Sequence, residues 1–147
     1  MISVTTDSAL TLANDLRPIV LRISRELRKE TEQFGVTARQ VTLLWLVKRS
    51  PGLTLRALAA EEAISAPALS GHVDRLERAG LIVRVRSAVD RRRVGLELTT
   101  DGERLLRRVR ERRTAWLADR LGTLDPDQLA AIQAAVEPLS ELIERTA

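Results

Sequence analysis

Apolar residues recur at three- and four-residue intervals near the start of the chain, the spacing of an amphipathic helix. They predict a helix over about residues 9–33, with one face made of Leu12, Leu16, Ile19, Ile23 and Leu27. Proline lacks the N–H of a helical hydrogen bond, so we expect Pro18 to kink this helix or to mark a second start near Asn14 or Asp15.

Three shorter helices with polar caps are predicted next. Thr37 and Gln40 have the spacing of a capping box, and Thr54 and Ser65 can cap the following two helices. Gly80 can take the left-handed conformation that ends the last of them. The inward-facing residues should be Val41, Leu44, Trp45, Leu55, Leu58, Ala59, Leu69, Val73 and Leu76.

After Gly80 the apolar period changes to two, which predicts two short strands over residues 81–86 and 94–98, joined by the polar loop Ser87–Arg93. Two short helices followed by a hairpin with a charged loop are a helix-turn-helix with a wing. The predicted fold class is therefore mainly α, of the α+β kind: a winged helix-turn-helix with long N- and C-terminal helices.

Two helices are predicted in the last third of the chain. A capping box of Thr100 and Glu103 should open a long helix that continues to about Leu121. Asp125-Pro126 with Gln128 should open the final helix, whose inward residues are expected to be Leu129, Ile132, Val136, Leu139 and Ile143.

The terminal helices carry wide apolar stripes, and so short a chain has little else to cover them. We therefore expect a homodimer formed by these helices. The expected organisation is one domain over residues 1–147, with a winged helix-turn-helix lobe at 36–98 and a helical dimerisation lobe made of 1–35 and 99–147.

The composition removes several classes of function. The chain has no cysteine and a single histidine, His72, which excludes disulfides, thiolate chemistry and multi-histidine metal sites. No stretch approaches the roughly 20 apolar residues that span a bilayer, and the start lacks a signal pattern. We expect a cytoplasmic protein without metal or cofactor. It is not expected to be an enzyme, because no nucleophile and base can be paired.

The basic charge lies in the middle of the chain. The net charge is 0 over residues 1–35, +5 over 36–98 and −1 over 99–147, and all but two of the 24 basic side chains are arginines. Arginine binds phosphates and base edges through a planar fork of donors. Charge confined to one segment indicates a surface that faces a polyanion.

The helix after Ser65 has an outward face of small residues that would let it enter a DNA major groove. Glycine inside a helix is unfavourable by about 1 kcal/mol against alanine, which makes Gly71 unusual unless close approach is needed. The alternative is a plain solvent face, and His72 fits either a core edge or a phosphate contact. The candidate DNA-binding residues here are Ser65, Ala66, Pro67, Ser70, Gly71, His72 and Arg75.

The loop of the hairpin carries Asp90, Arg91, Arg92 and Arg93. Adjacent arginines repel one another and serve no core, but they suit a narrow minor groove, whose potential attracts arginine. We expect Asp90 to orient the side chain of Arg92 or Arg75. The alternative is a solvated turn that Asp90 caps locally.

Residues 65–102 resemble the signature of the multiple antibiotic resistance regulator (MarR) family of winged-helix proteins. The resemblance is carried by the run Val73–Arg84, by Asp90-Arg91-Arg92, by Leu96–Thr99 and by Gly102, without insertion. Thr37 and Gln40 also fit and are added to the candidate DNA-binding residues.

The resemblance implies a homodimeric regulator, usually a repressor, that binds double-stranded DNA at a pseudo-palindromic operator. It also implies a small aromatic or anionic effector, held between the dimer helices and the winged helix, that weakens DNA binding. The candidate effector-binding residues are Arg17, Trp45 and Trp116. Peroxide sensing through a first-helix cysteine is excluded because the chain has none. The alternative function is an architectural winged-helix protein without strong sequence preference.

Overall fold

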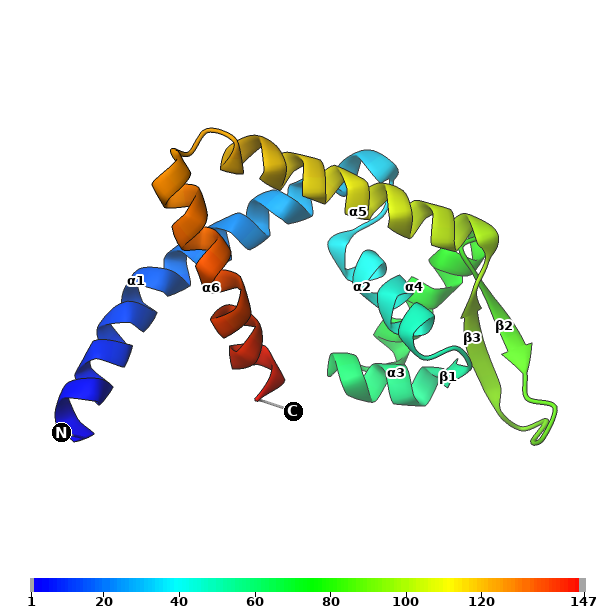
Figure 1. Cartoon of the computed structure of the whole chain (residues 1–147). Coiled ribbons are helices and arrows are strands. Elements are labelled where there is room, and N and C mark those ends of the chain that lie inside the picture. The colour runs from blue at the N-terminus through cyan, green and yellow to red at the C-terminus, as the bar shows by residue number, and fades with distance from the viewer. Residues whose placement is uncertain (1, 146–147) are drawn as a thin grey trace. The chain divides into compact units, whose positions relative to one another are not determined.

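The computed structural model of the protein describes residues 2–145, with side chains from residue 6 onward. Along this part of the chain, six α-helices, a short 3-10 helix and three strands follow one another (Figure 1). They are α1 Ile2–Lys29, η1 Glu32–Phe34, α2 Ala38–Arg49, β1 Leu53–Thr54, α3 Leu55–Glu62, α4 Ala66–Arg78, β2 Ile82–Arg86, β3 Val94–Leu98, α5 Thr100–Leu121 and α6 Pro126–Glu144. The mainly helical fold class is confirmed. Two compact units meet between Arg113 and Thr114, within α5.

The first helix is longer at its start and shorter at its end than expected. α1 begins before residue 9 and runs through Pro18 without interruption, so the second start near Asn14 or Asp15 is wrong. It ends at Lys29 because the N–H and the hydroxyl of Thr31 both donate to the carbonyl of Arg28, at 3.1 and 2.7 Å, which closes a turn. Gly35 then ends η1 with a φ of +72°.

Local polar caps fix the starts of the helices in the winged lobe, as predicted. Thr37 and Gln40 form the capping box: the Gln40 N–H donates to Thr37 Oγ1 at 3.1 Å, and the Thr37 N–H donates to Gln40 Oε1 at 3.0 Å. Thr54 Oγ1 accepts from Ala57 N–H and Ser65 Oγ from Ala68 N–H. The expected left-handed Gly80 follows α4 with a φ of +74°.

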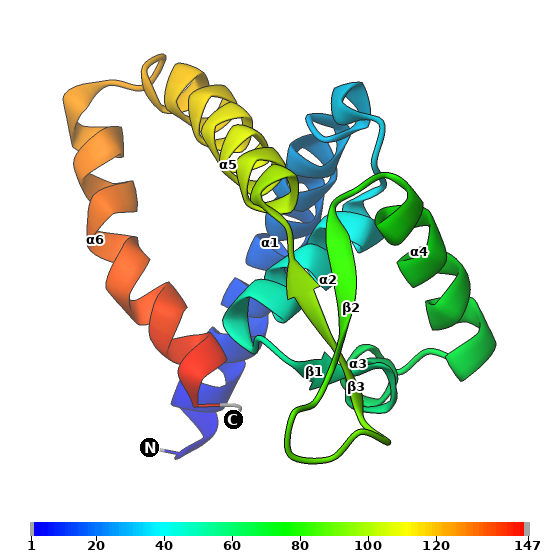
Figure 2. The ribbon, with the colours of Figure 1, turned by 90° about the vertical axis from the view of Figure 1, so that its right-hand side faces the viewer.

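The three strands form one antiparallel sheet in the order β1-β3-β2. β2 and β3 pair from Ile82 with Leu98 to Arg86 with Val94, which confirms the predicted hairpin. Figure 2 shows α4 beside this hairpin, whose loop projects beyond the sheet. β1 was not predicted because two residues are too few to show a period. The residue before β1 lies very close to β3: a Cβ at Gly95 would lie 2.5 Å from the carbonyl oxygen of Gly52.

The core lies in the first unit, between the helices of the winged lobe and the first half of α5. The predicted stripe of α4, Leu69, Val73 and Leu76, is buried in it. So are residues from the other elements of the lobe and from the first half of α5, namely Val41, Leu43, Leu44, Val47, Leu58, Ala59, Ile82, Leu96, Leu105, Leu106 and Val109. Trp45 and Leu55 are only half-buried, because they pack on the edge of this cluster.

The cap of α5 lies one residue before the predicted position. Thr99, and not Thr100, holds the helix start: its hydroxyl accepts from the Gly102 N–H at 3.0 Å and donates to the Gly80 carbonyl at 2.6 Å. The predicted box of Thr100 and Glu103 is therefore wrong. The first turn of α5 packs closely against the turn after α4, since a Cβ at Gly102 would collide with the carbonyl oxygen of Leu81.

The second unit contains the end of α5 and α6. The capping box of Asp125 and Gln128 is confirmed, with N–H donors 2.9 and 3.2 Å from their acceptors. The expectation of inward-facing residues on α6 is wrong within this chain, because none of the described residues of α6 is buried. Val136 is 61% exposed and Ile143 is 78% exposed.

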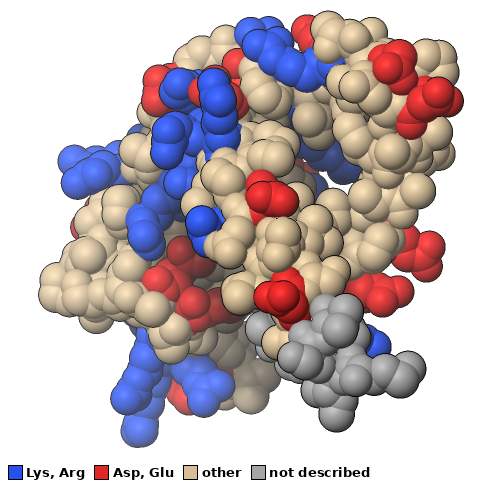
Figure 3. Space-filling model, turned by 90° about the vertical axis from the view of Figure 1, so that its left-hand side faces the viewer, with Lys and Arg blue, Asp and Glu red and all other residues tan. Residues whose placement is uncertain are grey.

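On the face of the molecule opposite to the one in Figure 2, acidic and basic side chains are interspersed with broad uncharged areas (Figure 3). The apolar exposure of α6 has a counterpart on α1, where Leu10, Leu12 and Ile19 are all more than half exposed. None of the helices in the described part of the chain combines the length and the apolar character needed to cross a membrane.

Candidate nucleic-acid interface

The outer face of α4 is made of small residues at its N-terminal end. Ala66, Pro67 and Ala68 are exposed, and Ser70 and Gly71 are half-buried. Apart from its chain neighbours and the adjacent backbone of α4, no atom of the described residues lies within 4 Å of a Cβ built on Gly71, so packing against the rest of the lobe does not require glycine there. Ser65 lies at the start of this face, with its hydroxyl oxygen accepting from the Ala68 N–H. The result is a shallow, uncharged surface that another molecule can approach closely.

The C-terminal half of α4 carries charged side chains tied to the hairpin. Arg84 on β2 extends to α4, with its Nη2 2.7 Å from Asp74 Oδ1 and its Nη1 3.6 Å from Glu77 Oε1. Arg78 Nε donates to the Asp74 carbonyl oxygen at 3.3 Å. Arg75 is exposed and forms no ion pair with any residue that the structure describes. From the sequence, Arg84 is recognised only as part of the family motif. Its ion pairs join two different elements, so no local sequence pattern indicates them.

The loop between β2 and β3 is held by its own hydrogen bonds. The Ser87 N–H donates to the Arg93 carbonyl at 2.9 Å, and the Arg93 N–H donates to the Asp90 carbonyl at 3.0 Å. Asp90 Oδ1 accepts from the backbone N–H of Arg92 at 3.0 Å. The expectation that Asp90 orients a guanidinium of Arg92 or Arg75 is therefore wrong: its carboxylate caps the turn, because the nearest donor is the backbone two residues ahead.

The arginines of this loop are exposed to solvent. Arg91, Arg92 and Arg93 form no ion pair within the described part of the chain, so their charge is available to a partner. Arg92 and Arg93 also line a pocket of about 470 Å³ together with Arg56 from α3. Sequence reasoning missed Arg56. Its position two residues after the helix cap Thr54, on the same lobe as the wing, was the available signal.

The other candidates near this surface have more restricted side chains. The polar groups of Thr37 and Gln40 are engaged in the cap of α2, and Gln40 is buried. His72 is half-buried, and its Nδ1 is inaccessible to solvent and has no hydrogen-bond partner among the described residues. The structure thus brings Arg56 beside the wing loop and ties the wing to α4 through Arg84, while the polar groups of Thr37 and Gln40 cap α2. Among the residues with described side chains, no group of three or more His, Cys, Asp or Glu is arranged to hold a metal ion.

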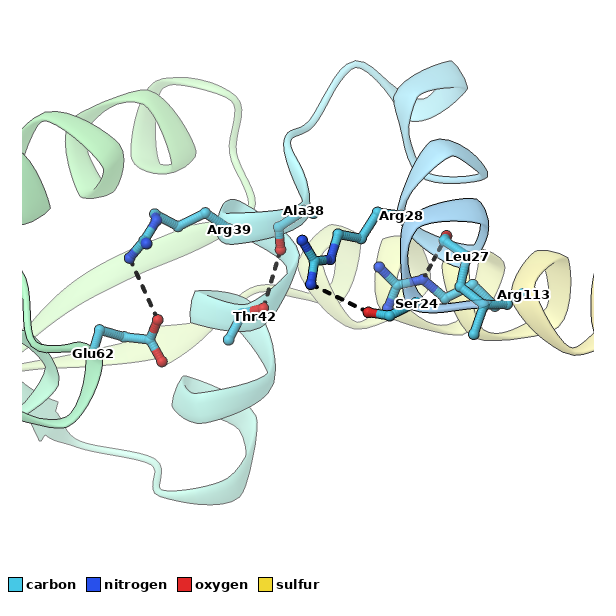
Figure 4. A pocket seen from close by; sticks show the side chains of 8 residues that line it. All are labelled: Ser24, Leu27, Arg28, Ala38, Arg39, Thr42, Glu62 and Arg113. Carbon is cyan, nitrogen blue, oxygen red and sulfur yellow. Dashed lines mark hydrogen bonds and ion pairs between the residues drawn. The ribbon is translucent and has the colours of Figure 1, made fainter. Parts of the chain in front are cut away.

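A second cavity, of about 530 Å³, lies among α1, α2, α3 and α5 within the first unit (Figure 4). It is lined by Ser24, Leu27, Arg28, Ala38, Arg39, Thr42, Glu62 and Arg113. None of the candidate effector residues lines it. Arg17 contacts Asn14 on its own helix, Trp45 lies under Lys48, and Trp116 belongs to the second unit, where it stacks with Arg120.

Three arginines and one glutamate give this cavity a positive charge. Arg39 lies 3.6 Å from Glu62, Arg28 Nη2 donates to Ser24 Oγ at 3.2 Å, and Arg113 Nε donates to the Leu27 carbonyl at 3.3 Å. Burial, and to a lesser degree the charge of Arg28, lowers the pKa of the Arg113 guanidinium. An anion entering here would relieve the repulsion between Arg28 and Arg113. This site could not be predicted from the sequence because its residues are far apart along the chain.

Comparison with known proteins finds similarity to transcriptional regulators from bacteria. A family model described as the MarR family matches residues 34–93. An uncharacterized HTH-type transcriptional regulator from Mycobacterium leprae is 31% identical over 140 residues, which cover 95% of this chain and 98% of that protein. The HTH-type transcriptional repressor MdtR of Bacillus subtilis is 30% identical over 120 residues, covering 82% and 76% of the two chains. The crystal structure of a transcriptional regulator from Thermotoga maritima superposes with a TM-score of 0.79 at 26% identity, covering 93% and 96%.

Proposed function

The chain belongs to the MarR family of DNA-binding transcriptional regulators, and we propose that it is a homodimeric, sequence-specific repressor that a small anionic effector releases from its operator. The observation that carries the DNA-binding part is the combination of two features on one lobe. One is the small, open face of α4 around Gly71, and the other is a self-supported wing whose loop arginines, Arg91–Arg93, have no ion pairs in the described part of the chain.

In the proposed complex α4 enters the major groove and the wing reaches the adjacent minor groove. Small side chains at the start of α4 allow the helix backbone to approach the base edges. The Arg92 side chain is free to enter a narrow minor groove, where the potential favours arginine. Arg56 lies beside the wing and suits a phosphate contact, which positions the protein without reading sequence.

The dimer is proposed from the apolar faces of α1 and α6. Exposed apolar areas of this extent are typical of protein interfaces. Side chains such as Leu12, Ile19, Ile132 and Val136 are each at least 44% exposed in the isolated chain. A two-fold axis relating two chains would then match a pseudo-palindromic operator with half-sites about one helical turn apart.

The effector is proposed to bind in the cavity lined by Arg28, Arg39 and Arg113. Guanidinium groups recognise carboxylates through two parallel hydrogen bonds, so an aromatic carboxylate is the expected chemical class. To release DNA, the effector must bind the DNA-incompetent conformation more tightly, with a typical coupling of about 1–3 kcal/mol. The repressor MdtR, similar over most of this chain, supports the repressing role.

The DNA-binding proposal is tested at Gly71. Gly71→Ala and Gly71→Leu should both fold, since the space around this Cβ is open. A duplex selected by the protein from a random pool should be preferred over a scrambled duplex by at least about 10³-fold at fixed salt. Leucine should abolish this preference by lifting α4 from the groove, while alanine should largely keep it. Equal affinity of the unmodified protein for both duplexes would instead favour an architectural protein.

The effector site is tested by titrating benzoate and salicylate into the protein–duplex complex. Release of the duplex should require Arg39, so the complex of the Arg39→Met variant should no longer release the duplex when benzoate or salicylate is added. Arg17→Met is the matched control, because Arg17 is also an exposed arginine but does not line the cavity. Equal sensitivity of the two variants would contradict the assignment.

A further inference from the structure

One ion-pair cluster joins the wing to α4. Arg84 on β2 contacts both acidic residues of α4, Asp74 at 2.7 Å and Glu77 at 3.6 Å. Within the described part of the chain, these are the only ion pairs between the hairpin and α4. The side chain of Arg84 is 34% exposed, so the cluster lies at the rim of the lobe and not in its core.

The wing has little else to hold it against α4. Ile82 is the only buried residue of β2, and the strand is exposed from Val83 onward. The loop beyond it is internally rigid because of the hydrogen bonds of Ser87, Asp90 and Arg93. A rigid tip on an exposed strand moves as a lever about its base. The six residues from Arg84 to Asp90 span at most roughly 20 Å, so a tilt of about 10° at Arg84 would displace the tip by up to about 3 Å.

We propose that Arg84 is a positioning residue for operator recognition, which rests on the proposed DNA-binding function. By bridging Asp74 and Glu77 it fixes the separation between the major-groove helix and the minor-groove arginines. It also offsets part of the negative charge of the two carboxylates of α4, which would otherwise repel phosphates more strongly. Discrimination between DNA sequences depends on this separation, because the helix and the wing must meet their base pairs at the same time.

Two other roles for Arg84 make different predictions. A direct phosphate contact would contribute equally to every DNA sequence, and its removal would make binding less dependent on salt. If the ion pair only stabilised the fold, its removal would lower the melting temperature and leave the discrimination between DNA sequences unchanged. Exposed ion pairs contribute little to folding stability. A positioning role predicts loss of discrimination while the salt dependence and the melting temperature change little.

The test compares Arg84→Met with Arg84→Lys and with the control Arg86→Met. Arg86 lies on the same strand, is also exposed and forms no ion pair with a described residue. Affinities are measured over a range of salt for the duplex selected by the unmodified protein and for its scrambled form. We expect Arg84→Met to lower the ratio of the two affinities about tenfold, comparable to one mismatched base pair. Arg84→Lys should retain most of the ratio, and Arg86→Met should leave it unchanged.

The partner side gives a second test with opposite signs. In Asp74→Ala/Glu77→Ala the lobe loses two negative charges while Arg84 remains. Simple electrostatics predicts tighter binding to both duplexes with an unchanged ratio, whereas the positioning role predicts a lower ratio despite the added positive charge. This double variant also tests the positioning role of Arg84 if Arg84→Met fails to fold.

Parallel loss of both affinities in Arg84→Met, with weaker salt dependence, would overturn the proposal in favour of a phosphate contact. An unchanged ratio in both Arg84→Met and the alanine pair would overturn it altogether. Failure of the unmodified protein to bind any duplex would instead refute the proposed function, and is therefore a separate result.

Discussion

The winged lobe and α6 have the same kind of apolar periodicity but opposite burial. Leu69, Val73 and Leu76 on α4 recur at intervals of three and four residues, and so do Leu129, Ile132 and Val136 on α6. The first three are at most 2% exposed, and the second three are at least 42% exposed. A periodic pattern therefore specifies a face that must be covered, but not whether the same chain covers it. The apolar face of α4 is covered by the other elements of the lobe and by the first half of α5, while α6 presents an apolar surface suited to a second copy.

The largest effect is expected from substitutions that disrupt the proposed dimer contact of α6 and leave the winged lobe intact. Ile132→Glu/Val136→Glu places two charges on the apolar face and should yield a monomer in sedimentation velocity. Affinity for the selected duplex should fall by about 10³-fold or more, since one lobe alone contacts one half-site. Gln133→Glu, on an exposed position of the same helix, is the control. A double variant that remains dimeric would show that α6 is not the interface.

Truncating the same side chain in the two regions sharpens the contrast. Leu69→Ala should destabilise the protein by about 2–5 kcal/mol because it leaves a cavity in the core. In urea unfolding this loss should appear at every protein concentration. Leu129→Ala should lower the midpoint mainly at low concentration, since its effect acts through association. Concentration-independent loss for both variants would contradict the difference between the regions.

Arg92→Ala tests whether the wing acts on DNA without supporting the fold. Only the backbone of Arg92 takes part in the turn, so the melting temperature should stay unchanged. Affinity for the selected duplex should fall by about tenfold. Arg107→Ala removes an exposed arginine from α5 and serves as the control. A melting temperature that falls together with the affinity would mean that Arg92 is structural.

The smallest expected effect concerns the cap of α4. Ser65→Ala removes the acceptor for the Ala68 N–H and should lower the free energy of unfolding by about 1 kcal/mol. Ser65→Asp keeps an acceptor at this position and should restore most of the stability. If aspartate is as destabilising as alanine in thermal unfolding, the hydroxyl has a role other than capping.

Features that depend on neighbouring residues could be predicted from the sequence. The caps at Thr37, Ser65 and Asp125 and the two strands of the hairpin follow from short-range hydrogen bonding and from alternation. The error at Thr99 arose because two threonines are adjacent and the choice between them depends on Gly80, which is distant in sequence. Local chemistry likewise explains why Asp90 binds the backbone of its own turn.

Features that join distant segments could not be predicted. The cavity with Arg28, Arg39 and Arg113 combines residues from four helices, and none of them stands out in its own segment. The bridge from Arg84 to Asp74 depends on how the wing leans on α4. The candidate DNA surface was partly predictable because the small face of α4 and the arginine run of the wing are each contiguous, although Arg56 beside them was missed.

The proposed binding of DNA by a homodimer is tested most directly by the composition and footprint of the complex with the selected duplex. Two chains bound per duplex, with two protected half-sites whose centres are about one helical turn apart, is the result we predict. Sedimentation equilibrium gives the number of chains, and hydroxyl-radical cleavage gives the protected positions. A single chain per duplex, or uniform protection without a two-fold pattern, would contradict it.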